Sequence, residues 1–226
     1  MKVLSVEHVK SLIEQSAGQE IKIPASSFLS RKAVEFIRNN HIHVNQESTE
    51  EKKEEKKEYM TSLSGKEMVV KTHPRIVFRG KLDTFQAEIL KTQILAEKYG
   101  DDELLRNLEE LLGYCRNILT AEVLDKPTGE CLLFGMKEDE LRCVSHHPKT
   151  YIGVGHVPPD FHMGEICIEL NLLRAKSREL EIAGVQAFYT KNRAERNDIL
   201  TALNRLSSAI YILYCRYLSK RNWGQL

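Results

Sequence analysis

Two arginines and a glutamate are spaced along one segment so that they share a helix face. Residues 170–181 contain no glycine or proline and consist mostly of strong helix formers. Arg174, Arg178 and Glu181 stand at i, i+4 and i+7, which places them within roughly 60° of one another. One arginine can donate two parallel hydrogen bonds to the oxygens of a phosphate group, so this face suits a polyanion such as a triphosphate. The alternative is a solvated face with an i, i+3 Arg–Glu pair worth about a few tenths of a kcal/mol.

Two other groups of polar residues have both a structural and a chemical interpretation. Asn204, Arg205 and Ser208 interrupt an apolar helical pattern, and a buried asparagine more often satisfies a neighbour than a ligand. Asp83 is expected near the start of a helix, where it would act as an N-cap with Gln86 at N3. Residues 61–81 are expected to form a basic loop. Its phosphate-binding groups are Thr61, Ser62, Ser64, Gly65, Lys66, Lys71, Arg75, Arg79, Gly80 and Lys81.

The elements that must position these residues are long amphipathic helices. We expect them at residues 82–99, 101–121, 164–188 and 198–219, with a short helix at 137–143. Several such helices joined by short turns predict an all-α core. The expected architecture is an up-and-down five-helix bundle, ferritin-like in style.

The chain divides into three parts by composition. Residues 1–45 alternate helical and strand-like patterns and predict a small α+β N-terminal appendage that buries little core by itself. A helix-turn-helix DNA reader is a poor alternative, because this segment lacks a pronounced basic face. Residues 46–60 form a charged linker of glutamate and lysine. Residues 61–226 form the predicted helical-bundle domain.

Overall composition excludes several classes of partner. The 226 residues are 42% hydrophobic and 29% charged, with a net charge of +1, which gives no electrostatic case for nucleic acid or an anionic membrane. No N-terminal apolar segment resembles a signal peptide, and no apolar run is long enough to span a bilayer, so we expect a cytoplasmic protein. The five cysteines are odd in number, with no Cys-x-x-Cys, so we expect neither a disulfide framework nor a thiolate zinc site.

Three segments together resemble a known enzyme family. Residues 71–85 resemble the Lys-x-x-x-Arg-Val-x-x-x-Gly-x-x-Asp-Glu-Leu segment of propanediol-utilisation-type ATP:cob(I)alamin adenosyltransferases. Residues 173–181 resemble that family's Ala-Arg-x-x-x-Arg-x-x-Glu helix, and residues 203–208 are similar to its Leu-Asn-Arg-Leu-Ser-Asp. The three motifs occur in the family's order, and the resemblance covers roughly residues 64–219.

The ethanolamine-utilisation group of corrinoid adenosyltransferases is the closer match. Four segments resemble that group: residues 23–30, 63–69, 145–148 and 170–174. The resemblance implies transfer of the 5′-deoxyadenosyl group of ATP to cob(I)alamin, which forms adenosylcobalamin and releases triphosphate for a B12-dependent pathway such as ethanolamine utilisation. ATP and cobalamin are then substrates, with Mg²⁺ as cofactor. The alternative is a non-catalytic corrinoid-carrying or helical interaction module on the same scaffold.

The sequence departs from the family in three places. Some members carry a metal-binding His and Cys-Cys-x-x-Cys cluster, whereas no Cys or His occurs here between Val44 and His73, so we expect no metal site there. Ser208 replaces the related family's Asp. The Thr-Gly-Asp-x-Gly phosphate loop is missing, and its work would fall to residues 61–66.

The resemblance assigns a role to each candidate residue. It implies a cationic clamp on the ATP phosphates, with Asn204 orienting the nucleotide and Glu181 holding Arg178 or a Mg²⁺-bound water. It implies that Asp83 pairs with Arg174 across a subunit interface of a homotrimer. Phe161 is the candidate aromatic beside the corrin, and a microcompartment or reductase is a candidate partner. The clamp candidates are Lys66, Lys71, Arg75 and Arg178.

One cluster of metal-ligand residue types remains. Its irregular spacing across a Pro/Gly-rich loop favours a lid or corrin contacts over a metal site. The residues are Cys143, His146, His147, His156 and His162.

Overall fold

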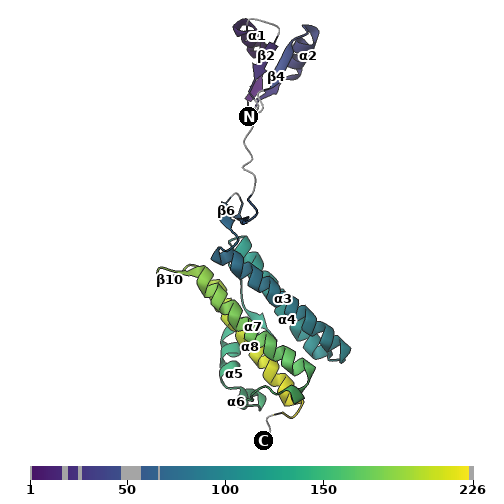
Figure 1. The fold of residues 1–226 in the computed structure, drawn as a ribbon, viewed down its shortest axis with the longest axis vertical. Helices are drawn as coiled ribbons and strands as arrows, with labels where there is room; N and C mark the ends of the chain where they lie inside the picture. The colour runs from purple at the N-terminus through teal and green to yellow at the C-terminus, as the bar shows by residue number, and fades with distance from the viewer. Residues whose placement is uncertain (1, 17–19, 25–26, 47–56, 66, 224–226) are drawn as a thin grey trace. The chain divides into compact units, whose positions relative to one another are not determined.

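The computed structural model describes residues 2–16, 20–24, 27–46, 57–65 and 67–223. The chain separates into two compact units, residues 1–57 and 58–226 (Figure 1). The predicted charged linker lies largely at residues 47–56, outside the described residues. The proposed boundaries of appendage, linker and bundle domain therefore remain predictions.

The first unit consists of two β-α-β segments. This mixture of helix and strand agrees with the small α+β appendage that the sequence predicted. β1 pairs with β3 and β2 with β4, both in parallel. Ser30 caps the second helix, because its side chain accepts a hydrogen bond from the Ala33 backbone N–H at 3.3 Å. The elements are β1 (Lys2–Leu4), α1 (Val6–Gln15), β2 (Glu20–Ile23), β3 (Ser27–Leu29), α2 (Arg31–Asn39) and β4 (His43–Gln46).

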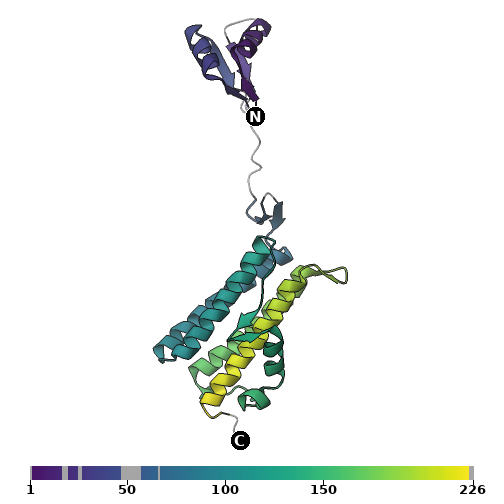
Figure 2. The same cartoon turned by 180° about the vertical axis from the view of Figure 1, so that it is seen from behind.

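The second unit is a helical bundle, which confirms the predicted all-α core. Helix α7 packs against both α3 and α8, and α4 packs against α3 and α8, while the shorter α5 lies on α8 (Figures 1 and 2). The long helices are α3 (Pro74–Lys98), α4 (Asp102–Val123), α7 (Glu165–Phe188) and α8 (Asn197–Lys220), and α5 spans Glu138–His146.

Short elements connect or precede the helices. Hairpin β5–β6 comes before α3, β7–β8 comes before α5, and β9–β10 joins α7 to α8. Their bounds are β5 (Met60–Ser64), β6 (Glu67–Val70), β7 (Leu132–Leu133), β8 (Met136–Lys137), α6 (Pro148–Ile152), the 3₁₀ helix η1 (Phe161–Met163), β9 (Tyr189–Thr190) and β10 (Arg193–Ala194). Within the described residues, no helix is both long and apolar enough to cross a bilayer.

The first long helix begins earlier than the sequence predicted. Helix α3 starts at Pro74 rather than residue 82, and β5 and β6 occupy part of the segment expected to be a loop. Pro74 suits the first helical turn, and the His73 side chain accepts from the Arg75 N–H at 3.3 Å. The predicted capping role of Asp83 is therefore wrong, because this residue lies in the helix interior.

Helices α7 and α8 approach each other closely at Gly184. A Cβ atom built on Gly184 would lie 2.4 Å from Leu203 Cδ1, and Leu203 is itself buried. Gly113 in α4 has no atom within 4 Å of the same position. Substitutions at Gly184 and Gly113 can therefore be compared, because only at Gly184 would an added methyl group meet a neighbouring side chain.

We expect Gly184→Ala to destabilise the bundle by about 1–3 kcal/mol through overpacking. Gly113→Ala serves as the control and should raise stability by about 0.5–1 kcal/mol, because alanine favours helix. Urea unfolding of both variants measures the two effects. Equal changes in the two midpoints would show that Gly184 is not a packing requirement.

Candidate active site

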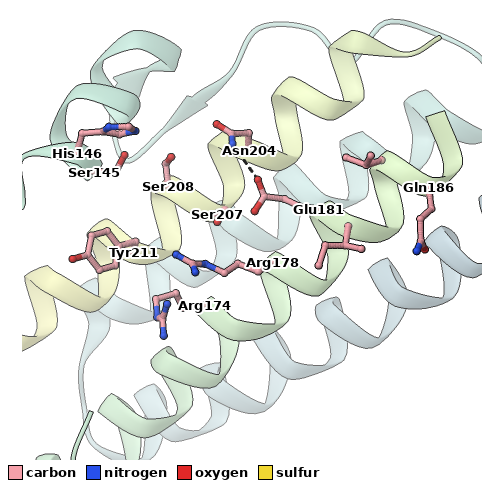
Figure 3. Close-up of a pocket in the computed structure, with 12 residues that line it drawn as sticks. Ser145, His146, Arg174, Arg178, Glu181, Gln186, Asn204, Ser207, Ser208 and Tyr211 are labelled. Atoms are coloured by element: carbon pink, nitrogen blue, oxygen red, sulfur yellow. Dashed lines mark hydrogen bonds between the residues drawn. The ribbon is translucent and has the colours of Figure 1, made fainter. Parts of the chain in front are cut away.

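A pocket of about 740 Å³ opens between α7 and α8 and is bordered by the end of α5 (Figure 3). It brings together four of the predicted site residues: Arg174, Arg178, Glu181 and Asn204. Its other lining residues are Ser145, His146, Ile182, Val185, Gln186, Ser207, Ser208 and Tyr211.

Helix α7 presents the charged residues because its neighbouring stripe is anchored in the core. Leu170, Leu173 and Leu180 are buried on that stripe. Ser177, the polar member of the same stripe, is also buried and donates through Oγ to the Arg174 backbone oxygen at 2.8 Å. The arginine face is therefore fixed in direction by apolar packing.

The two arginines of this face differ in their surroundings. Arg174 donates through Nε and Nη2 to Asn171 Oδ1, at 3.1 and 2.9 Å. Within the described part of the chain, no hydrogen bond or ion pair engages the guanidinium of Arg178, which extends toward α8 (Figure 3). The guanidinium of Arg178 is therefore available to an anionic ligand.

Glu181 and Asn204 form a contact that joins the two helices across the pocket. The Asn204 Nδ2 group donates to Glu181 Oε1 at 3.1 Å. Burial raises the pKa of Glu181, while hydrogen bonds from Ser207 and Asn204 and the charge of Arg178 act in the opposite direction. The carboxyl group therefore takes up its proton at a higher pH than an ordinary glutamate.

Arg75 occupies a different place from the one its predicted role suggests. Its Nε contacts Glu122 Oε1 at 2.6 Å, and the Arg79 Nε contacts Glu122 Oε2 at 2.5 Å. The Glu122 side chain is 0% exposed, and Arg79 also donates through Nη2 to the Leu63 backbone oxygen at 2.8 Å. This cluster ties hairpin β5–β6 and the first turns of α3 to the end of α4.

The other predicted site residues that the structure describes do not line the α7–α8 pocket. Lys71 is exposed after β6, and Asp83 is exposed on α3. Phe161 is 77% exposed and stacks on His162 with ring centroids 3.8 Å apart. Lys66 lies outside the described residues. The predicted roles of these four residues, and of Arg75, stay predictions.

The Cys and His residues of the loop do not gather around one point. Across the residues that the structure describes, no three His, Cys, Asp or Glu side chains form a group suited to a metal ion. Cys143 Sγ donates to the Tyr151 hydroxyl at 3.3 Å, and His162 contacts Asp160 at 2.6 Å. His146 lines the α7–α8 pocket.

Two important residues were not identified from the sequence, although each carried a signal. Tyr211 follows Asn204 and Ser208 at i+7 and i+3, the spacing of one helix face. Glu122 lies on the same buried face of α4 as Cys115 and Ile118, at i+7 and i+4 from them. A buried carboxylate needs a cationic partner, so this position indicated an ion pair.

Comparison with known proteins identifies the family. The sequence model of the cobalamin adenosyltransferases matches residues 52–217, which include the whole α7–α8 pocket. The chain belongs to the cobalamin adenosyltransferase family. This membership confirms the resemblance drawn from the three motifs, and it makes the chain a transferase.

Individual relatives agree with the family assignment. The chain is 31% identical to the corrinoid adenosyltransferase EutT of Escherichia coli (strain K12), over 91% of this chain and 88% of the relative. It is 38% identical to the corrinoid adenosyltransferase EutT of Salmonella typhimurium (strain LT2), over 73% of this chain and 61% of the relative. These relatives confirm the ethanolamine-utilisation type of cobalamin adenosyltransferase. No solved structure matches the chain.

Proposed function

We propose that this chain transfers the 5′-deoxyadenosyl group of ATP to cob(I)alamin in the α7–α8 pocket, for a B12-dependent pathway such as ethanolamine utilisation. The observation that carries the proposal is the Arg178 guanidinium, which faces this pocket beside the Glu181–Asn204 pair in a member of the family. The relatives are named as adenosyltransferases, which favours the enzyme over the corrinoid-carrying or interaction-module alternative.

The reaction needs positive charge at its leaving group. The electron pair of cob(I)alamin attacks C5′ of ATP, a cobalt–carbon bond forms, and the C5′–O bond breaks. Triphosphate leaves with that bonding pair, so its oxygens gain negative charge, and a fixed cation lowers the barrier by stabilising them. Arg178 supplies that cation in our proposal, with Asn204 orienting the nucleotide. Predicted clamp residues Lys66, Lys71 and Arg75 would complete the phosphate site.

The pocket also offers apolar surface beside its charges. Ile182 and Val185 line it and remain 60% and 49% exposed, a large fraction for apolar side chains. They lie on the same helix as Arg178, so the corrin face or the adenine would meet apolar and cationic groups together. Phe161 remains the proposed aromatic near the corrin.

The number of carboxylates in the pocket limits how Mg²⁺ could bind there. Glu181 is the one carboxylate among the described lining residues, and Mg²⁺ prefers several oxygen ligands in octahedral geometry. The protein side chains of this pocket therefore do not fit a resident Mg²⁺ site. In our proposal the ion arrives with the ATP phosphates, and Glu181 contacts its water shell or Arg178.

The site is proposed to be completed by a second subunit. Within the described residues, Asp83 makes no ion pair and the Arg174 guanidinium hydrogen-bonds only to the uncharged Asn171, so both retain a charge for a partner. A pair between them across the interface of a homotrimer would build the pocket from two chains. A cytoplasmic location and a microcompartment or reductase partner are proposed from the same family resemblance.

The raised pKa of Glu181 predicts the acid limit of activity. As pH falls through this pKa, Glu181 loses the charge that faces Arg178 and weakens its contact with Asn204. We therefore expect activity to fall on the acid side at a higher pH than the titration of an ordinary glutamate would give. Glu181→Gln should lower the maximum and abolish this acid limb. A pH–rate profile with the same limb in both proteins would remove Glu181 from the site.

An anaerobic assay tests the proposed function. Purified protein is mixed with ATP, Mg²⁺ and chemically reduced cob(I)alamin, and the corrinoid spectrum is followed. We expect conversion to adenosylcobalamin that requires both ATP and protein. A protein that binds the corrinoid but leaves its spectrum unconverted would support the carrier alternative instead.

A further inference from the structure

Arg205 is a buried arginine that lies next to the proposed nucleotide pocket without lining it. The residue is 7% exposed and belongs to α8, directly after Asn204. It lines a separate cavity of about 740 Å³, together with Glu138 of α5 and Tyr114 of α4. Arg205 is therefore not among the residues that line the α7–α8 pocket.

A continuous series of contacts joins Arg205 to that pocket. The Glu138 Oε1 atom accepts from Arg205 Nε at 3.3 Å, and Arg205 Nη1 donates to Asn204 Oδ1 at 3.0 Å. Asn204 in turn donates through Nδ2 to Glu181 Oε1 at 3.1 Å. The series crosses from α5 through α8 to α7.

The polarity of these contacts allows one orientation of the Asn204 amide. A guanidinium is only a donor and an ionised carboxylate is only an acceptor. Arg205 must therefore face Oδ1 and Glu181 must face Nδ2, since the reversed amide would set donor against donor and acceptor against acceptor. Asn204 itself is exposed, so packing does not hold its side chain in place.

We propose that Arg205 and Glu138 are positioning residues that fix the orientation of Asn204 in the nucleotide pocket. The inference rests on the proposed function of that pocket. Arginine is required because two different nitrogens of one planar group reach Glu138 and Asn204 at once. Lysine has a single ammonium group on a flexible stem and cannot reproduce this fork.

A double-mutant cycle tests the proposal with the full chain. Glu138→Ala, Asn204→Ala and the double variant are compared with the unaltered protein for kcat and for the KM values of ATP and the corrinoid. We expect Glu138→Ala to raise the KM for ATP by about fivefold, the scale of one coupled hydrogen-bonded pair. In the Asn204→Ala background, Glu138→Ala should have no further effect, because it acts through Asn204.

Two further variants distinguish positioning from general stability. Asp139→Ala removes the next carboxylate of α5, which makes no hydrogen bond or ion pair among the described residues, and it should leave the KM for ATP unchanged. Arg205→Lys keeps the charge and should raise the KM for ATP as Glu138→Ala does. Thermal midpoints recorded for every variant show that the proteins are folded.

The outcomes separate this inference from the proposed function. Additive effects of Glu138→Ala and Asn204→Ala, or an unchanged KM in Arg205→Lys, would overturn the positioning role while leaving the enzyme active. An unaltered protein that forms no adenosylcobalamin would overturn the proposed function and the inference that depends on it. Non-additivity confined to the KM for ATP would support the positioning role.

Discussion

Arg178→Ala is expected to lower kcat/KM for ATP by about 100-fold, the scale of losing one donor to charge that develops in a transition state. The reason is that Arg178 faces the pocket with no partner among the described residues, so its charge is available to the leaving triphosphate. Arg178→Lys should recover part of the loss, because lysine keeps the charge without the two-pronged contact.

Lys176→Ala is the matched control for this experiment. Lys176 is a cation of the same helix, but it lines a separate groove against α3 with Gly80 and Thr84. Its removal should change kcat/KM for ATP by less than about twofold, the effect of a screened surface charge. Steady-state kinetics under anaerobic conditions measure both variants. Equal losses in Arg178→Ala and Lys176→Ala would point to a general charge effect rather than a phosphate contact.

Glu122→Gln is expected to cost about 3–5 kcal/mol of folding free energy, because breaking a buried ion pair leaves charges without compensation. Here one fully buried carboxylate faces two guanidiniums, those of Arg75 and Arg79. The substitution keeps the size of the side chain and removes its charge. It should also loosen hairpin β5–β6, since Arg79 holds the Leu63 backbone oxygen.

The control for this prediction comes from the same helix. Glu109 pairs with Arg116 at 3.9 Å on the surface, so Glu109→Gln should cost less than about 1 kcal/mol. Urea unfolding of the two variants gives the comparison directly. Similar unfolding midpoints would mean that the Arg75–Glu122–Arg79 cluster is not a major support of the bundle.

Much of the α7–α8 pocket could be predicted because it depends on local periodicity. The face of Arg174, Arg178 and Glu181 follows from 3.6 residues per turn once the apolar stripe is buried. Helix α7 begins and ends within a residue of the prediction for the same reason. Asn204 could be identified as a candidate because it is a polar residue within an apolar helical pattern.

Contacts between distant parts of the chain could not be predicted. Arg75 and Glu122 are 47 residues apart, and periodicity does not say which acidic residue meets a given arginine. The start of α3 was missed because Ile76, Val77 and Gly80 have modest helix propensity, which the packing of Phe78 on Phe188 overrides. The contact between Arg205 and Glu138, which are 67 residues apart, also requires the folded bundle.

Isotope transfer tests the central claim most directly, since it follows the carbon that must move. ATP labelled with ¹³C at C5′ is incubated anaerobically with cob(I)alamin and the unaltered protein, and the corrinoid product is analysed by mass spectrometry and NMR. The account predicts adenosylcobalamin with the label on the cobalt-bound carbon, together with released triphosphate. In Arg178→Ala, the same product should form at a greatly reduced rate. Labelled ATP recovered intact beside unmodified corrinoid would contradict the account.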